Sequence, residues 1–297
     1  MAPSTDHELT RPLPPARTLF SYGMTTIAFL LTGLALLPLL SILLEILVRG
    51  APQLRWEVLT SLPAPVGEAG RVNGFANAIV GTLTMVGIAA LVSIPIGVLT
   101  AVYLSEFGKR SPIARGIRFV VTVLSGVPSI VVGVFAYGVI VVNTIAGYKG
   151  FSALAGSFAL AVIMLPIIVL ASEEALKLVP TPQRLASAAL GANHLQTTFR
   201  VVVAAALPGI TTGALLAVAR AAGETAPLIF TALFNPQNFS DGLLGPIASL
   251  SVMIFNYANS PFAEQTQLAW SASVILVGIV LLINVLSRRV TQRSTHR

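Results

Sequence analysis

The sequence predicts an all-α integral membrane protein with six transmembrane helices. Three observations support this fold class. Hydrophobic residues make up 55% of the 297 residues and charged residues only 10%, whereas a soluble domain carries about 25% charged residues. Six apolar stretches are long enough to cross a bilayer. Lysine and arginine residues are concentrated on one side of these stretches.

The apolar stretches define the candidate spans. A hydrocarbon core of about 30 Å needs about 20 helical residues at 1.5 Å rise each. The predicted spans are residues 24–48, 77–104, 117–142, 154–172, 207–234 and 268–287. The apolar segment 246–258 is too short to span. We expect it to be a re-entrant or interfacial helix that either packs on the bundle or meets a partner protein.

The basic residues predict the orientation. Thirteen of the 18 lysines and arginines fall on one side of the spans, Arg220 lies inside a span, and the other side receives Arg49, Arg55, Arg71 and Lys149. The side richer in positive charge is cytoplasmic, which places both termini in the cytoplasm. Residues 1–20 are polar and proline-bearing, so we expect a disordered cytoplasmic tail rather than a cleaved signal, followed by one domain over 21–297.

Several kinds of chemistry are disfavoured by the sequence. The chain has no cysteine, and its three histidines lie outside the predicted spans. A nucleotide-binding P-loop requires Gly-Lys-Ser or Gly-Lys-Thr, and none of Lys109, Lys149 and Lys177 stands in that context. The basic clusters are short and form no continuous face for nucleic acid. We expect a chain surrounded by membrane lipid that binds no cofactor and relies on another protein for any ATP hydrolysis.

The predicted fifth span contains an unusual group of residues. Arg220 lies near its middle, where a charge costs about 2.5–3.5 kcal/mol to insert. Glu224 follows four residues later and therefore shares its helix face. Pro227 removes the hydrogen bond to the carbonyl of Gly223, which predicts a helix kink at these two residues.

Two interpretations of this group remain open. Arg220 and Glu224 can be a buried ion pair that only fixes the orientation of the helix. Alternatively Arg220, Glu224 and the adjacent Thr225 line a substrate path. The planar guanidinium donors match phosphate oxygens in pairs, and Glu224 would keep anion binding weak enough for release.

The cytoplasmic segment 180–206 has the pattern of a short helix, a turn and a second helix. The alanine-rich stretch 185–190 favours a helix, and Gly191 can end it because glycine tolerates the left-handed conformation. A second helix then runs from about Leu195 into the fifth span. The segment is either a rigid protrusion that docks on a partner or a helix lying on the lipid surface.

This segment resembles the EAA loop of ABC importer permeases, which has the pattern Glu-Ala-Ala, three residues, then Gly. Aligning its glycine with Gly191 puts the pattern at Leu185, Ala186 and Ser187, so leucine stands in place of the glutamate. The resemblance implies that Leu185, Ala186, Ser187, Gly191 and Ala192 form a coupling loop that docks in a groove of a separate ATPase.

Other stretches are more specific. Residues 77–108, SGVPSIVVG at 125–133 and ARAAGETAPLIFTALF at 219–234 resemble the PstA family of permease subunits of bacterial phosphate ABC importers. This resemblance implies the MetI-like type I importer fold in the bacterial inner membrane, and half of a pathway for inorganic phosphate. It also implies a PstC-like permease, a PstB-like ATPase dimer that binds ATP and Mg²⁺, and a PstS-like periplasmic phosphate-binding protein. An importer of another small oxyanion or solute is the alternative.

The predicted orientation can be tested in intact cells because the chain contains no cysteine. Single cysteines replacing Ser61 and Ser294 would be treated with a membrane-impermeant thiol reagent. We expect labelling at 61 and protection at 294, since 49–76 is predicted to be outside. The reverse pattern would overturn the topology.

Overall fold

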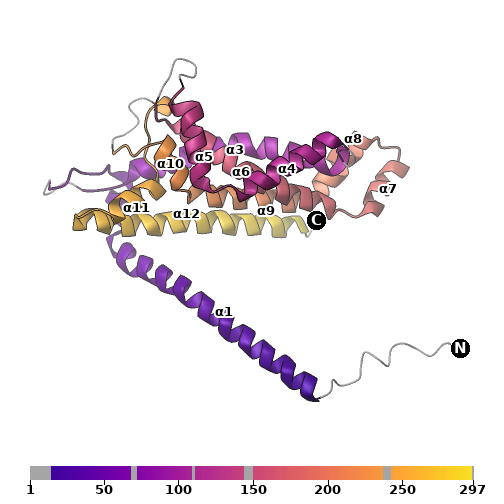
Figure 1. Ribbon diagram of the computed structural model, residues 1–297, viewed down its shortest axis with the longest axis horizontal. Coiled ribbons are helices and arrows are strands. Elements are labelled where there is room, and N and C mark those ends of the chain that lie inside the picture. Colours follow the sequence, from indigo (N-terminus) through magenta and orange to yellow (C-terminus); the bar gives the residue numbers. More distant parts are fainter. Residues whose placement is uncertain (1–14, 68–71, 109–110, 144–149, 237–241, 296–297) are drawn as a thin grey trace. The chain divides into compact units, whose positions relative to one another are not determined.

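The computed structural model describes residues 15–67, 72–108, 111–143, 150–236 and 242–295, which form helices joined by turns and loops, with no strand among them (Figure 1). The chain divides into two compact units, 1–48 and 49–297. The boundary between these units lies near Val48, within the residues 21–297 that were predicted to be one domain. Each unit makes most of its contacts internally, and each is described by itself.

The described part of the first unit is helix α1, which runs Pro15–Gly50 and so extends two residues past the boundary at Val48. Residues 15–20 belong to this helix, so the predicted disordered tail over 1–20 is too long at its C-terminal end. Pro15 begins the helix because the missing amide N–H of proline costs nothing at the first helical position. Residues 1–14 lie outside the described residues. Apolar side chains along α1, such as Phe29 and Leu34, are exposed, as expected for a helix surrounded by lipid.

Four long helices form the core of the second unit: α3 (Ala76–Val102), α6 (Ala153–Lys177), α9 (Val203–Ala222) and α12 (Ala263–Thr295). α3 packs on α6, α6 on α9, and α9 on α12; Figure 1 shows the last three running side by side. α9 continues a helix that starts at α8 (His194–Gln196) and passes through the π-helical turn η5 (Thr197–Val202). Met85, Leu160, Met164 and Ile168 are fully buried between these helices.

Small residues let these helices approach closely. A Cβ atom on Gly213 would lie 2.4 Å from the Cβ of Ala171, and one on Gly209 would lie 2.6 Å from the Cβ of Ala175. The two pairs are four residues apart on both α9 and α6, which is the small-residue spacing typical of tightly packed membrane helices. Close packing of α9 on α6 therefore depends on these four positions.

The predicted third span, 117–142, is not one straight helix. α4 (Pro112–Gly126) and α5 (Ser129–Ala136), which continues as the π-helical turn η4 (Tyr137–Val141), meet at an angle of 106°. The bend lies at Val127 and Pro128, both of which are extended, with ψ of 128° and 136°. Proline has no amide N–H and disfavours the helical conformation in the residue before it. The helix therefore ends instead of bending gradually.

The predicted fifth span, 207–234, is also interrupted. α9 ends at Ala222, and the short helix α10 (Ala226–Thr231) begins four residues later. Pro227 does not kink a continuous helix; it lies in the first turn of α10, where proline is tolerated. α10 packs on α5, where a Cβ on Gly133 would come within 2.6 Å of the Pro227 Cα.

A second cluster of apolar residues closes the end of the bundle that carries α11 (Leu250–Ala258). Leu250 and Met253 of α11 are fully buried, together with Phe75 before α3 and Ala272 of α12. Segment 246–258 thus packs on the bundle, which was one of the two arrangements expected for it. Shorter elements lie before α3, namely η2 (Ala51–Gln53) and α2 (Trp56–Thr60), and η6 (Gly242–Leu244) precedes α11.

Among the described residues, five helices are long and apolar enough to cross a membrane, and the bent α4–α5 pair makes a sixth when it is counted as one broken span. The five helices are Pro15–Gln53, Ala76–Phe107, Ala153–Lys177, His194–Ala222 and Ala263–Leu286. The fold class predicted from the sequence is therefore confirmed. The correction concerns continuity, because the third and fifth predicted spans each contain a break.

Gly81 and Gly87 of α3 provide a matched pair for testing helix packing. A Cβ on Gly81 would come within 1.9 Å of the Ala248 carbonyl oxygen, whereas nothing lies within 4 Å of one on Gly87. We expect Gly81→Ala to destabilise the fold by about 1–3 kcal/mol through overpacking. Gly87→Ala should be neutral or stabilising by up to about 1 kcal/mol, since alanine favours a helix. Thermal unfolding in detergent measures both; equal melting temperatures for the two variants would contradict the packing.

Candidate functional site

The predicted loop 180–206 forms a helix, a turn and a second helix, as expected. α7 (Thr181–Ala189) is followed by its C-cap residue Leu190 and then by Gly191, which has a φ of +83°. The N–H of Gly191 donates to the Ala188 carbonyl and that of Ala192 donates to the Ser187 carbonyl. These two bonds make the Schellman motif that closes helices on a left-handed glycine. Asn193 then begins α8 with a capping box shared with Gln196.

The loop presents apolar side chains outward and is held from within. Leu185 is 64% exposed and Leu190 is 89% exposed. Ala186 and Ala192 also lie on the accessible part of the loop. Ser187 is buried, and its hydroxyl lies 2.9 Å from the Thr197 hydroxyl, which joins α7 to η5. The loop therefore has a fixed shape and an accessible apolar surface.

Arg220 and Glu224 form the predicted ion pair. Arg220 Nε donates to Glu224 Oε1 at 3.4 Å, which is long for such a bond. The Arg220 side chain is 60% exposed and that of Glu224 is 14% exposed. Arg220 belongs to the last turn of α9, so the expectation that it lies mid-helix is wrong. The helix that carries it starts earlier, at His194, and ends earlier, at Ala222, than the predicted span.

Arg220 nevertheless lies level with the middle of another spanning helix. It lines a cavity together with Pro166 of α6, which is close to the midpoint of that helix. Ser125 at the end of α4 and Ser129 at the start of α5 line the same cavity. The remaining lining residues are apolar: Leu124, Val127, Val132, Val162, Ile163, Ile167 and Leu170. Two serines at the α4–α5 break and Arg220 of α9 are thus the polar residues that line this cavity.

The other residues predicted to line the path lie at the break after α9. Glu224 and Thr225 do not line this cavity. Gly223 is the C-cap of α9, and Thr225 is the N-cap of α10, where its carbonyl accepts the N–H groups of Leu228 and Ile229. The Glu224 carbonyl accepts a hydrogen bond from the Ser251 hydroxyl at 2.8 Å. These residues therefore fix the end of α9 rather than extend the cavity.

Sequence reasoning missed two charge pairs whose acids are almost fully buried. Arg118 pairs with Glu173, and Arg184 pairs with Glu106. Glu106 and Glu173 lie within two residues of the ends of the predicted spans 77–104 and 154–172. In the sequence they therefore resemble ordinary charged residues at the membrane interface. The partners are 55 and 78 residues apart in the chain. The sequence shows an acidic residue at the end of each apolar run, but it does not show which arginine pairs with that residue.

Comparison with known proteins gives the family. Residues 93–296 match the model of the binding-protein-dependent transport system inner membrane component family. The phosphate transport system permease protein PstA of Pasteurella multocida is 39% identical over 266 residues, covering 89% of this chain and 92% of that protein. PstA of Haemophilus influenzae is 42% identical over 248 residues, covering 83% and 85%. A probable PstA of Methanocaldococcus jannaschii is 36% identical, covering 85% and 87%.

Solved structures agree at the level of the fold. A chain of the MetNI methionine ABC transporter matches with a TM-score of 0.60 and 22% identity, covering 74% of this chain and 95% of that one. A chain of a bacterial alginate ABC transporter matches with a TM-score of 0.64 and 13% identity, covering 94% and 96%. The chain therefore belongs to the inner membrane components of binding-protein-dependent transport systems and, among them, to the PstA permeases.

Proposed function

We propose that this chain is a permease subunit that carries inorganic phosphate through the bacterial inner membrane. As a permease of an ABC importer, it works with an ATPase and a substrate-binding protein. The proposed partners are a PstC-like permease that forms the other half of the pathway, a PstB-like ATPase dimer and a PstS-like periplasmic phosphate-binding protein. ATP and Mg²⁺ bind to the ATPase and not to this chain. Both termini face the cytoplasm.

The observation that carries the proposal is the position of Arg220. Arg220 lines a cavity at the α4–α5 break, level with the middle of α6. A charge at that depth is costly unless it has a partner or a polar path. Glu224 is a partner at 3.4 Å, a long contact that leaves most donors of Arg220 unused. Arg220 therefore suits the transient binding of a phosphate oxyanion. Ser129 can assist as a hydrogen-bond donor, whereas the Ser125 hydroxyl donates to the Thr122 carbonyl at 2.7 Å.

The proposed coupling surface is the α7 loop. Leu185, Ala186, Ser187, Gly191 and Ala192 form or support an element with a fixed turn and exposed leucines. Leu185, in place of the glutamate of the family pattern, makes this contact apolar rather than ionic. In this proposal the α7 loop docks on the ATPase and moves with it.

The role of Arg220 can be tested by ATP-dependent phosphate uptake of the reconstituted complex, with sulfate as competitor. We expect Arg220→Gln to leave the complex assembled and to lower uptake at least tenfold. Arg220→Lys keeps the charge but loses the planar pair of donors, so a partial loss is expected. Glu224→Gln should be milder, because Glu224 only tunes the affinity for the anion.

Two further variants complete this test. Exchanging Arg220 and Glu224 preserves an ion pair but moves the positive group from the last turn of α9 to the break that follows it, so uptake should remain lost. Arg55→Gln removes an exposed positive charge outside the cavity and is the matched control. Normal uptake by the Arg220→Gln complex at matched membrane levels would eliminate the proposed role.

The α7 loop can be tested at Gly191. Its φ of +83° strains a β-branched residue, whereas asparagine tolerates this conformation. We expect Gly191→Val to lower uptake severalfold while membrane insertion is retained, and Gly191→Asn to stay close to wild type. A cysteine replacing Ala192 should crosslink to the ATPase. If no cysteine placed anywhere in 185–198 crosslinks to the ATPase, the proposed docking is refuted.

A further inference from the structure

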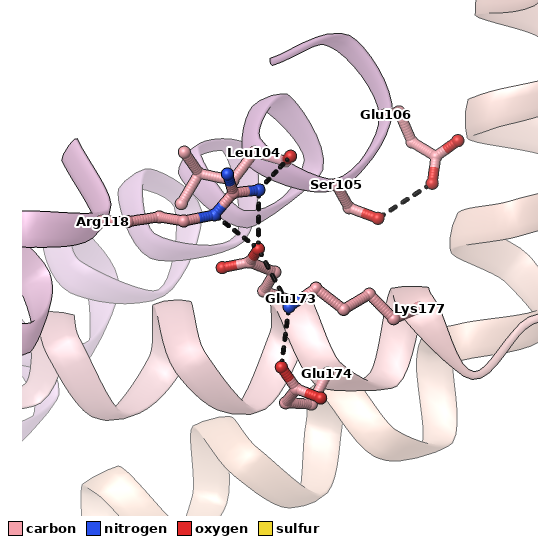
Figure 2. A network of polar contacts seen from close by, with 7 residues as sticks. All are labelled: Leu104, Ser105, Glu106, Arg118, Glu173, Glu174 and Lys177. Carbon is pink, nitrogen blue, oxygen red and sulfur yellow. Dashed lines mark hydrogen bonds and ion pairs between the residues drawn. The ribbon is translucent and has the colours of Figure 1, made fainter. Parts of the chain in front are cut away.

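Two arginine side chains join the ends of α3 and α6 near the α7 loop. Arg118 of α4 and Arg184 of α7 each bind one carboxylate and one backbone carbonyl. We call these two sets of contacts the arginine clamps. Figure 2 shows the first clamp, with Arg118 reaching both the Leu104 carbonyl and Glu173.

The first clamp holds α4 to both α3 and α6. Arg118 Nε donates to Glu173 Oε1 at 2.9 Å, and Arg118 Nη2 lies 2.9 Å from the same oxygen. Nη2 also donates to the Leu104 carbonyl at 2.7 Å, in the π-helical turn η3 (Tyr103–Phe107) that ends α3. The Glu173 side chain is only 4% exposed and has a second cation, Lys177, at 3.2 Å. The carboxylate is thus neutralised inside the structure.

The second clamp holds α7 to the same two helices. Arg184 Nη1 contacts both oxygens of Glu106, at 2.6 and 2.7 Å. Arg184 Nη2 donates to the Leu176 carbonyl at 2.8 Å, in the last turn of α6. The Glu106 side chain is 5% exposed, and Ser105 donates to it at 2.9 Å. Charge-assisted bonds of this length are the strong ones among protein hydrogen bonds.

The two clamps are reciprocal. Arg118 binds the carbonyl at the end of α3 and the acid of α6, and Arg184 binds the carbonyl at the end of α6 and the acid at the end of α3. The last carbonyls of a helix lack their usual partners within the helix. Arg118 binds such a carbonyl at Leu104, and Arg184 adds a bond to the Leu176 carbonyl, which also accepts the Val179 N–H at 3.3 Å. α4 and α7 are therefore attached to a common pair of helix ends, and a displacement of α7 strains the attachment of α4.

α4 connects the first clamp to the Arg220 cavity. Ser125 lies seven residues after Arg118, about 10 Å along the helix, and both Leu124 and Ser125 line the cavity. α4 ends one residue later, at Gly126, next to the 106° break. Nothing lies within 4 Å of a Cβ built on Gly126, so the last residue of α4 faces open space.

We propose that Arg184 and Arg118 are positioning residues that transmit the movement of α7 to the cavity lining at the end of α4. The identity of the solute and the movement of α7 with the ATPase rest on the function proposed above, whereas the contacts that would carry the movement do not. Arg184 takes the movement from α7 to the ends of α3 and α6. Arg118 passes it to α4, which moves Leu124 and Ser125 relative to Arg220.

The first test measures ATP hydrolysis and phosphate uptake by the same reconstituted complex. We expect Arg184→Gln and Arg118→Gln to retain ATP hydrolysis within about twofold of wild type while uptake falls at least tenfold, so that more ATP is hydrolysed per phosphate. Arg115→Gln, on the exposed side of α4, is the matched control and should leave the ratio unchanged. Hydrolysis and uptake that fall in parallel would mean a purely structural role and overturn the proposal.

Exchange of the charges separates geometry from stability. The double variant Arg184→Glu with Glu106→Arg restores an ion pair and should recover part of the coupling that Arg184→Gln loses. If the exchange does not assemble, Arg118→Lys decides the matter. Lysine keeps the charge opposite Glu173 but lacks the planar fork that also reaches Leu104, so it should assemble normally and raise the ratio of ATP to phosphate. An unchanged ratio would overturn the proposal.

The second test does not depend on the solute. Spin labels on Ala189 of α7 and Val123 of α4, both exposed, would each be paired with a label on Leu282 of α12. In the wild-type complex we expect both distances to change when ATP binds. With Arg184→Gln, the Ala189 distance should still change and the Val123 distance should not. If the Val123 distance in the Arg184→Gln variant changes as much as it does in the wild type, the link is refuted. A wild-type complex that moves normally but takes up no phosphate would instead refute the proposed function.

Discussion

Backbone hydrogen bonding without water is the constraint on which the rest of this structure depends. In a hydrocarbon core every unpaired N–H or C=O group costs several kcal/mol, so the chain forms long helices wherever it crosses. The two breaks obey the same rule. At the α4–α5 break the Val127 N–H donates to the Leu124 carbonyl, and after α9 the Glu224 carbonyl accepts the Ser251 hydroxyl. Irregular backbone is tolerated because it is paired locally and lies beside a cavity.

The same absence of water sorts the charged residues into two kinds. Glu106 and Glu173 are almost fully buried, and each is neutralised by an arginine at 2.6–2.9 Å. Removing one partner from such a pair leaves a costly uncompensated charge, so these pairs hold helix ends together. Arg220 differs because its contact to Glu224 is 3.4 Å long and its side chain remains 60% exposed. A loosely held cation next to a cavity suits a ligand that must bind and leave.

These features arrange the second unit along its length. The α7 loop lies at one end of the bundle and α11 at the other (Figure 1). The cavity that Arg220 lines lies beside the middle of α6. α4 runs from the arginine clamps to the cavity, and α6 passes both. The solved ABC transporter chains share this fold at 13–22% identity. The scaffold is therefore shared with transporter chains of low sequence identity.

The amino-acid sequence by itself determined the fold class, the positions of most helices and the identity of two candidate sites. Composition and the length of apolar runs predict spanning helices because lipid leaves few alternatives. Gly191 predicts the turn after α7 because the left-handed conformation is a local property of one residue. The ion pair of Arg220 and Glu224 follows from spacing along one chain segment. All of these signals are local.

Only the tertiary structure decided how the breaks and the charges are used. Pro128 and Pro227 each signal a disturbed helix, but only the structure shows that each lies at the start of a new helix, α5 or α10, and that these two helices pack on each other. The depth of Arg220 in the membrane is inferred from the cavity that it shares with the middle of α6, because its position in the last turn of α9 alone would suggest a helix end. The arginine clamps join residues 55 and 78 positions apart, and pairing over such separations leaves no periodicity in the sequence. Each of these outcomes is a relation between helices, which a single chain segment does not encode.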